Sequence, residues 1–328
     1  MLMEEGKLPY NILENIIKKF SFSDGTMVKG PGIGVDCSVF DNGNNFIIVT
    51  SDPVTYVASG KYCVNVNVND IAAMGGEAWF FLCTIILPVD FAQNTFEYIM
   101  DEIKGECENF KINFAGGHTE INKIVNSPVI CGFMVGKCKK DELRGAFNAK
   151  DGDILIITKG VSVEGTSIIA ESKAREIAEQ YGAKFYKKCT LYKDRLSVLE
   201  EARLARPLSN AMHDITEGGL INGLYEIAVA SDVSIEVDYF PVIPECKILC
   251  DALHINPLGL ISAGTLAITT KNKNLKDILI NNGIEAFEIG RIIKDGKNEV
   301  RYKGSVQEIF KNDEIVKLFK GERKLGIK

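Results

Sequence analysis

The stretch His213-Asp214-Ile215-Thr216-Glu217-Gly218-Gly219 places two acids, a hydroxyl group and two glycines directly before an apolar helical run. Glycine lets a backbone approach a ligand closely, and the free N–H groups at the start of the following helix would face an anion. A carboxylate in the same turn suits a hard cation that travels with phosphate. A single segment of this kind is weak support, so its repetition along the chain decides the interpretation.

Four further segments share the design, with an acid beside glycine or another small residue. They are residues 32–36, 50–52, 69–70 and 116–120. Converging carboxylates repel one another unless a cation holds them together, and Mg²⁺ binds through carboxylates and substrate phosphates. An aspartate in a helix interior is unfavourable, so Asp70 is the hardest of these acids to explain as a local structural feature. Together the five segments predict a magnesium–ATP site.

Composition narrows the class of protein. A chain of 328 residues suits two domains, and its net charge of −6 argues against a general nucleic-acid or membrane-surface binder. No apolar run reaches the roughly 18–20 residues that span a bilayer, and we expect no signal peptide. The nine cysteines lie mostly in apolar patterns without a CxxC pair, which is typical of reduced thiols. We therefore expect a cytoplasmic protein.

Strands and helices alternate in the predicted secondary structure, which indicates an α/β or α+β class with mixed sheets. Apolar periodicity predicts helices over 11–20, 62–74, 91–110, 166–181, 191–204 and 219–230, and strands over 45–52, 79–87, 112–115, 128–137, 153–158 and 234–237. The alternating valines at 64, 66 and 68 also fit a strand, and the helix over 62–74 is preferred because its pattern continues to a Gly75-Gly76 stop. Residues 116–120 are expected to form a polar turn between two strands. Turn chemistry at 148–152 places a domain boundary near Ala149.

Several smaller features leave alternatives open. Residues 160–166, between a strand and a helix, could bind phosphate or form a plain loop. Cys246 and Cys250 could share a helix face, but zinc would need more ligands, so we expect core packing. The three histidines exclude a histidine-rich metal centre. His118 and His213 lie in the glycine segments, and that placement favours a role at the site.

These motifs, in this order, resemble the aminoimidazole ribonucleotide synthetase-like (PurM-like) superfamily over essentially the whole chain. Residues 32–39 resemble its GIGDDAAV segment, with Val35 in place of the first acid. Residues 68–75 match its VNDLAVMG segment closely, and 213–219 match HDPTEGG. Residues 51–53 and 116–120 resemble its TTD-P and GGxT segments.

The resemblance implies a two-domain fold and a set of site residues. It implies an N-terminal domain, residues 1–149, that binds ATP and forms a dimeric β-barrel, and a C-terminal α/β domain, residues 150–328. The metal ligands it implies are Asp36, Asp70 and Asp214. The nucleotide-binding residues expected from the resemblance and the glycine segments are Gly34, Asn69, Gly116, Gly117, Thr119, Glu120 and Gly218. The catalytic residues expected on the same grounds are Lys7, Asp52, His118 and His213, where Lys7 either enters the site or lies in solvent.

The finer pattern is most similar to the hydrogenase expression/formation (maturation) branch. Members of that branch carry a terminal cysteine that accepts a carbamoyl group, whereas no cysteine follows Cys250 here. We therefore expect an ATP- and Mg²⁺-dependent homodimer that activates an oxygen-containing acceptor by phosphorylation or dehydration, with a hydrogenase-maturation protein as a possible partner. The alternatives are a small-molecule kinase or synthetase of the thiamine-monophosphate kinase or aminoimidazole type, and a non-catalytic nucleotide-binding protein.

Overall fold

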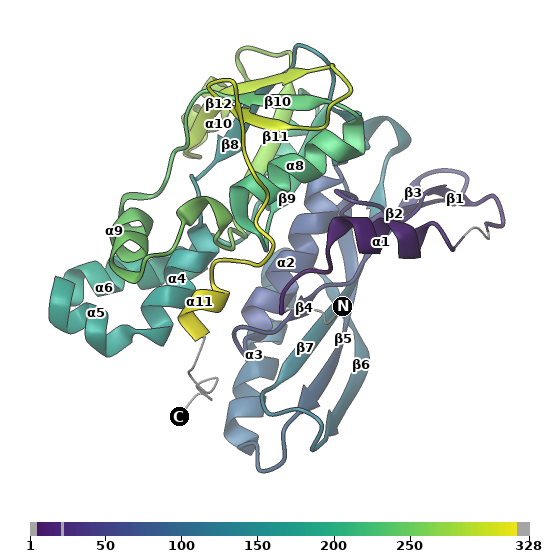
Figure 1. Ribbon diagram of the computed structural model, residues 1–328. Coiled ribbons are helices and arrows are strands. Elements are labelled where there is room, and N and C mark those ends of the chain that lie inside the picture. Colours follow the sequence, from purple (N-terminus) through teal and green to yellow (C-terminus); the bar gives the residue numbers. More distant parts are fainter. Residues whose placement is uncertain (1–4, 21–22, 320–328) are drawn as a thin grey trace.

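The computed structural model describes residues 5–20 and 23–319 and arranges them around two mixed sheets (Figure 1). The strands of the first sheet are β1 (Met27–Lys29), β2 (Ser38–Asp41), β3 (Phe46–Thr50), β4 (Pro53–Val54), β5 (Glu77–Leu87), β6 (Asn113–Ile121) and β7 (Val129–Cys138). Their order is β1-β2-β3-β7-β5-β6, and β4 pairs with β7. β6 is therefore an edge strand, joined in parallel to β5.

The second sheet follows in the chain. Its strands are β8 (Ile154–Thr158), β9 (Ala211–Ile215), β10 (Ser234–Val237), β11 (Thr265–Thr270), β12 (Ala286–Ile293), β13 (Val300–Tyr302) and β14 (Ser305–Val306). Their order is β14-β13-β10-β12-β8-β11-β9, so β9 lies at the edge. The adjacent strands β8 and β11 consist largely of buried residues, as expected when both faces of a sheet are covered.

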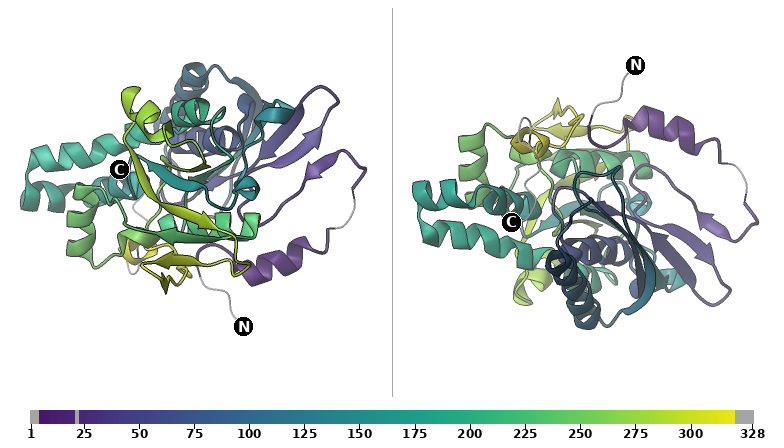
Figure 2. Two further views of the ribbon diagram at one scale, coloured as in Figure 1. Left: turned by 90° about the horizontal axis from the view of Figure 1, so that it is seen from above. Right: turned by 90° about the horizontal axis from the view of Figure 1, so that it is seen from below.

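Helices cover these sheets and join them. They are α1 (Tyr10–Ile17), α2 (Gly60–Ala73), α3 (Gln93–Phe110), α4 (Val163–Ser172), α5 (Ala174–Tyr181), α6 (Ala183–Thr190), α7 (Leu199–Ala205), α8 (Gly219–Ser231), α9 (Pro244–Leu253), α10 (Leu275–Asn281) and α11 (Val316–Phe319). Short 3-10 turns span Lys140–Glu142, Ala146–Asn148, Leu191–Arg195 and Pro257–Gly259. The α5–α6 pair projects from one side of the molecule, opposite α1 and β1 (Figure 2).

Helix α2 lies between the two sheets, and this position decides where the site forms (Figure 1). Thirteen of its fourteen residues are buried. Val64, Val68 and Ile71 pack in the core under the first sheet, whereas Ala72 and Ala73 pack with residues of α7, α10 and the second sheet. A helix enclosed on all sides must satisfy its polar side chains inside the protein, and α2 carries Asp70 among them.

Most of the predicted elements are confirmed with shifted bounds, and three differences have clear causes. The predicted helix over 166–181 begins earlier and breaks at Lys173 into α4 and α5. The predicted helix over 191–204 is split into a 3-10 turn and α7, because the backbone between them hydrogen bonds to Asn69. Helix α6 and strands β1, β2, β4, β9, β13 and β14 were not predicted. The boundary near Ala149 stays a prediction, and it falls between β7 and β8.

The predicted polar turn at residues 116–120 is wrong, because these residues continue strand β6. A β carbon on Gly117 would lie 1.8 Å from the carbonyl oxygen of Cys83 on β5, and its φ is +148°. The glycine is therefore required by the close approach of two parallel strands around a bulge, and not by a hairpin. In the described part of the chain, no helix is long and apolar enough to cross a membrane.

Candidate active site

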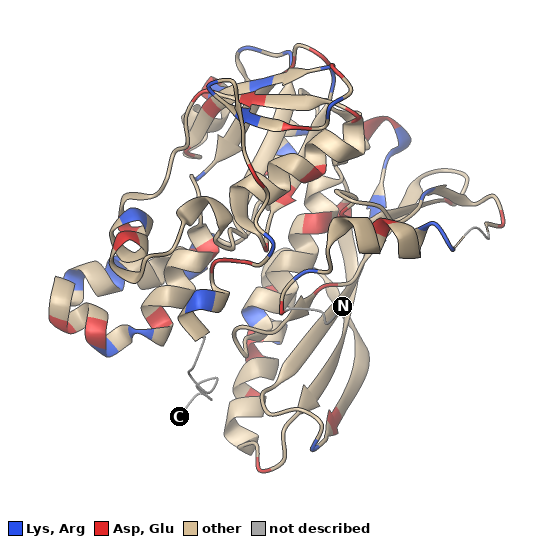
Figure 3. Ribbon diagram, in the orientation of Figure 1, with Lys and Arg blue, Asp and Glu red and all other residues tan. Residues whose placement is uncertain are grey.

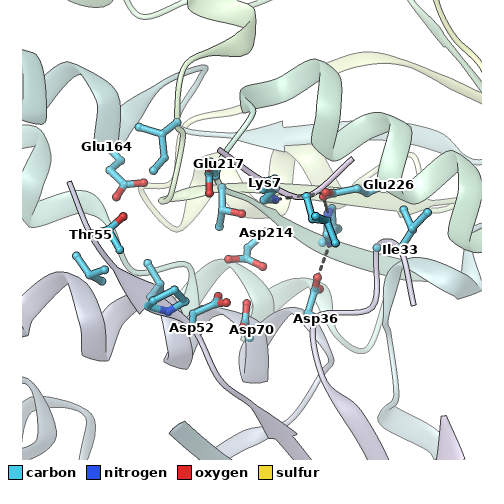
Figure 4. Close-up of a pocket in the computed structure, with 18 of the residues that line it drawn as sticks. Lys7, Ile33, Asp36, Asp52, Thr55, Asp70, Glu164, Asp214, Glu217 and Glu226 are labelled. Carbon is cyan, nitrogen blue, oxygen red and sulfur yellow. Dashed lines mark hydrogen bonds and ion pairs between the residues drawn. The ribbon is translucent and has the colours of Figure 1, made fainter. Parts of the chain in front are cut away.

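Four of the predicted acids line one cavity of about 410 Å³ between the two sheets (Figure 4). Asp36 precedes β2, Asp52 follows β3, Asp70 lies in the last turn of α2, and Asp214 lies in β9. Elements from both sheets and the helix between them therefore meet here. The convergence expected from the five acid segments is present for these four, whereas the acid of the fifth segment, Glu120, lies outside the cavity.

Backbone packing brings Asp36 to its place. A β carbon on Gly34 would lie 2.4 Å from the carbonyl oxygen of Glu226, and its φ is +69°. Only glycine allows the turn at 32–36 to lie directly against helix α8 in this conformation. The turn then presents Asp36 to His213, whose Nδ1 lies 2.7 Å from Asp36 Oδ1.

Asp70 is held by a short hydrogen bond in a crowded, negatively charged setting. Its Oδ2 accepts a hydrogen bond from Thr50 Oγ1 at 2.5 Å. Burial, reinforced by the charges of the neighbouring aspartates, raises the pKa of Asp70 well above its usual range. Burial and the neighbouring acids also raise the pKa of Asp214 to about 8, and burial raises the pKa of Asp36 and of Asp52. These carboxylates are destabilised in each other's company, which a bound cation would relieve.

His213 connects this cluster to a set of ion pairs on α8. Its Nε2 lies 2.9 Å from Glu226 Oε2. Glu226 Oε1 in turn accepts hydrogen bonds from Tyr10 Oη at 2.9 Å and Lys7 Nζ at 3.3 Å. Burial opposes the charged imidazole, but Asp36 and Glu226 outweigh it and raise the pKa of His213 well above its usual range. His213 is therefore a buried cation between two carboxylates, and both its ring nitrogens are engaged.

The charges in the cavity do not balance. Seven carboxyl groups line it, against two basic groups among the described lining residues, Lys7 and His213. Two buried oxygens, Asp36 Oδ2 and Asp214 Oδ2, accept no hydrogen bond from the described residues. Ligand atoms of Asp36, His213 and Asp214 lie within 4.8 Å of one another. Unpartnered carboxylate oxygens at this spacing are the donors that a hard divalent cation takes.

The structure separates the predicted site residues into two groups. Those that line the cavity are Lys7, Gly34, Asp36, Asp52, Asp70, His213 and Asp214. Those that lie outside it are Asn69, Gly116, Gly117, His118, Thr119, Glu120 and Gly218. The five residues of the second group from 116 to 120 belong to edge strand β6, where the His118 side chain is 68% exposed. Within one chain, β6 takes no part in the cavity.

Asn69 connects α2 to the segment that precedes α7. Its Nδ2 donates to the Leu196 carbonyl oxygen at 2.8 Å, and its Oδ1 accepts from the Val198 N–H at 2.9 Å. Both side-chain groups are thereby occupied, and the residue is fully buried. In this conformation Asn69 positions the helix that carries Asp70.

Asn69→Ala should lower the free energy of unfolding by about 2 kcal/mol, because it leaves two buried backbone groups without partners. Urea unfolding followed by circular dichroism measures this change. Asn94→Ala, at the exposed start of α3, is the matched control and should change it by less than about 0.5 kcal/mol. Equal changes in the free energy of unfolding in the two variants would contradict this connecting role of Asn69.

Gly218 begins α8, but its N–H is not open to a phosphate. It donates to Asp313 Oδ2 at 2.6 Å, and Asp313 Oδ1 also accepts from the N–H groups of Ile261 and Ile315. In this conformation the turn therefore faces a carboxylate of the chain itself, and a nucleotide-binding role of Gly218 stays a prediction. Asp313, from the segment before α11, already caps the helix with a carboxylate.

Sequence reasoning did not identify Glu226 and Tyr10, which line the cavity, or Thr50, which holds Asp70, and it considered Glu164 only as part of the possible phosphate loop at 160–166. Glu226 alone carried a readable feature, because it is the one acid within the apolar run of α8. The others are ordinary in their local sequence and become notable only through contacts distant in the chain. As a whole, the arrangement can bind divalent cations and an anionic ligand between them, close to an ion-paired lysine.

Comparisons with known proteins place both parts of the chain in one family. Residues 34–138 match the family model described as AIR synthase related protein, N-terminal domain, and residues 150–303 match the corresponding C-terminal domain model. The selenide, water dikinase of Methanococcus maripaludis is 30% identical over 321 residues, which cover 88% of this chain and 93% of that protein.

Two solved structures have a similar fold. AaThiL complexed with AMPPCP and TMP, from Aquifex aeolicus, superposes with a TM-score of 0.72 at 23% identity, covering 90% of this chain and 94% of that one. The hydrogenase maturation protein HypE in complex with ATP gives a TM-score of 0.66 at 17% identity, covering 91% and 90%. At these identities the likeness establishes the two-domain fold.

Proposed function

Because the chain belongs to the AIR synthase related protein family, with matches to both of its domain models, we propose that it is a Mg²⁺- and ATP-dependent enzyme that activates an oxygen-containing acceptor by phosphoryl transfer or dehydration. The observation that carries the proposal is the excess of buried carboxyl groups around two unpartnered oxygens. Such a cluster is costly to keep without a cation and has the oxygen donors that Mg²⁺ prefers.

In the proposed site, Asp36, Asp70 and Asp214 hold the metal. Bound Mg²⁺ would supply charge neutralisation for the acids and for the phosphates. Thr50 fixes the Asp70 carboxyl, and His213 fixes that of Asp36 from the other side. Asp52 faces the same space as these acids (Figure 4). These residues would thus position the metal and the phosphates and stabilise their charges. Positioning and charge stabilisation are the main contributions of a protein to phosphoryl transfer.

Lys7 supplies the mobile positive charge in this scheme. Its Nζ lies 3.3 Å from Glu226, and the neighbouring acids hold its pKa above the usual range despite burial. We propose that Lys7 stays protonated and contacts the phosphates, while Tyr10 and His213 keep Glu226 satisfied when the lysine turns away.

The relatives favour a small acceptor. The protein that shares 30% identity is named as a kinase of selenide and water, and the kinase structure of similar fold was solved with TMP. A role with a hydrogenase-maturation partner is the alternative, for which the similar fold of HypE, also solved with HypF, is the support. Release of ADP with a small acceptor and no partner protein would separate the two.

Calorimetry with AMPPCP, with and without Mg²⁺, is the direct test of the proposal. We expect nucleotide binding that depends on the metal, together with ADP release from ATP when an acceptor is present. Binding without any turnover across acceptors would favour the non-catalytic alternative. Absence of metal-dependent binding would remove the basis of the proposal.

We further propose a homodimer formed through the open face of the first sheet. Helices α2 and α3 cover one face of β5 and β7, where Phe81, Ile85 and Met134 are buried. The opposite face carries partly exposed apolar residues such as Leu82 and Phe133, and these strands show little charge (Figure 3). Edge strand β6 lies beside this face, so pairing of two copies would also cover its free edge.

Sedimentation at micromolar concentration should give about twice the 36.1 kDa chain mass. Phe133→Lys should shift the protein toward the monomer, because it would bury an unpaired charge in the proposed interface. The control is Ile280→Lys, a substitution on α10 at a residue of similar exposure. A wild-type monomer, or dissociation by both substitutions alike, would argue against this interface.

A further inference from the structure

The cavity extends beyond the metal-binding acids into a second region, which we call the acceptor end. The cavity lining also includes apolar side chains, among them Val54, Val57, Val66, Ile168 and Ile261, of which Ile168 belongs to the same helix as Glu164. Glu164 and Thr55 lie on the side of the cavity away from Asp36 and Ile33, with their oxygens turned toward one another (Figure 4). The proposed metal site therefore leaves this region free for a second molecule.

Glu164 is the buried ionisable group of the acceptor end. It lies in the first turn of α4 and is 5% exposed. Its Oε2 accepts the Ala263 N–H at 3.1 Å, and its Oε1 accepts no hydrogen bond from the described residues. Burial raises the pKa of Glu164 to about 8, which measures the cost of an ionised carboxyl with one donor. A ligand that donates a hydrogen bond to Oε1 would remove that cost.

Positive charge lies elsewhere in the cavity. The two basic groups among the described lining residues, Lys7 and His213, are both paired with Glu226 at the other end. At the start of α4, the Ser162 N–H donates to Ser262 Oγ and the Gly165 N–H donates to the Ile261 carbonyl oxygen, so these two groups are not free to bind an anion. A phosphate or carboxylate group on the acceptor would therefore meet acids and apolar walls here.

We infer that the acceptor is a small molecule that offers N–H donors, from an amine or an amide, to Glu164 and carries no phosphate or carboxylate at this end. This inference rests on the proposed function and adds the substrate class. Glu164 recognises the acceptor, the apolar walls hold its carbon skeleton, and its reacting oxygen faces the proposed metal site. Acceptors that are themselves phosphate esters are excluded from this orientation.

Three probes of similar size test the inference: butylammonium, butyramide and butyl phosphate. Their affinities are measured by ligand-detected NMR on the full chain with Mg²⁺ and AMPPCP present. At least one of the N–H probes should bind 10-fold or more tightly than butyl phosphate. Glu164→Leu should weaken that N–H probe at least 10-fold. Glu164→Gln should weaken butylammonium but leave butyramide within about 3-fold, since an amide oxygen can still accept a hydrogen bond.

Glu171→Gln is the matched control, because it removes a carboxylate from the same helix outside the cavity and should change no affinity. If butylammonium is the N–H probe that the wild type binds more tightly, and Glu164→Gln weakens it 10-fold, the acceptor group is an amine. If butyramide is the tighter probe and Glu164→Gln retains its binding, the acceptor group is an amide. Equal or tighter binding of butyl phosphate, no binding of either N–H probe, or unchanged affinities in Glu164→Leu would overturn the inference. AMPPCP binding, measured first in each sample, reports separately on the proposed function and on folding.

Discussion

Asp70→Asn should weaken Mg²⁺-dependent binding of AMPPCP by 10-fold or more. A factor of 10 corresponds to about 1.4 kcal/mol, the order expected for the loss of one charged ligand. Asp70 lies in the last turn of the central helix, so its carboxyl reaches the cavity from between the two sheets. Asn keeps the shape and can still accept from Thr50, so the loss should come from the removed charge.

The same experiment has a second arm in Asp214→Asn, which removes an acid from the opposite sheet. Asp232→Asn, in the left-handed position that ends α8, is a control outside the cavity and should leave affinity unchanged. Both cavity variants should bind AMPPCP without Mg²⁺ about as well as the wild type or better, because each lowers the negative charge. Unchanged Mg²⁺-dependent affinity in both cavity variants would refute the assignment of the metal ligands.

Removing a carboxylate should also stabilise the metal-free protein. The buried aspartates raise one another's pKa values, so each ionised neighbour destabilises the native state. A cluster of acids that destabilises the fold but increases the affinity for a cation is typical of a functional site. Stability and affinity should therefore change in opposite directions in Asp70→Asn, which a purely structural carboxylate would not show.

The sequence predicted the central helix and the acid on it for physical reasons. Apolar residues at helical spacing and the glycine pair at 75–76 defined α2, and an aspartate inside such a helix had no local explanation. The structure explains it through Thr50, which is the last residue of β3 and lies 20 residues earlier in the sequence. Local periodicity therefore located the unusual residue but could not name the group that holds it.

The glycines at 116 and 117 show the limit of local reasoning. A glycine pair beside polar residues favours a turn when only neighbours in sequence are considered. In the fold, Gly117 is required because a parallel strand passes too close for a side chain. Parallel pairing joins segments distant in sequence, so no periodicity could have indicated it. Asn69 and Gly218 differ from expectation for a similar reason, since both are engaged by segments more than 90 residues away.

Glu226→Gln should be the most destabilising single substitution in the cavity, lowering the free energy of unfolding by about 3–5 kcal/mol. Glu226 accepts hydrogen bonds from Tyr10 and Lys7 and pairs with His213. Gln retains the size, but its amide oxygen cannot balance the charges of the buried His213 and of Lys7. Glu288→Gln, at an exposed site on β12, is the control and should change stability by less than about 0.5 kcal/mol.

The pH dependence of stability shows whether the ion pairs of Glu226 cause this loss. Burial alone would raise the pKa of Glu226, but Lys7 and His213 outweigh it and lower the pKa to about 2 from 4.5. A carboxyl whose pKa is lower in the folded state contributes stability that is fully present above pH 4.5 and is lost as the pH falls toward 2. The wild type should therefore lose more stability than Glu226→Gln over this interval. If the two proteins lose stability in parallel between pH 4.5 and 2, the ion-pair explanation fails and the cost must come from packing.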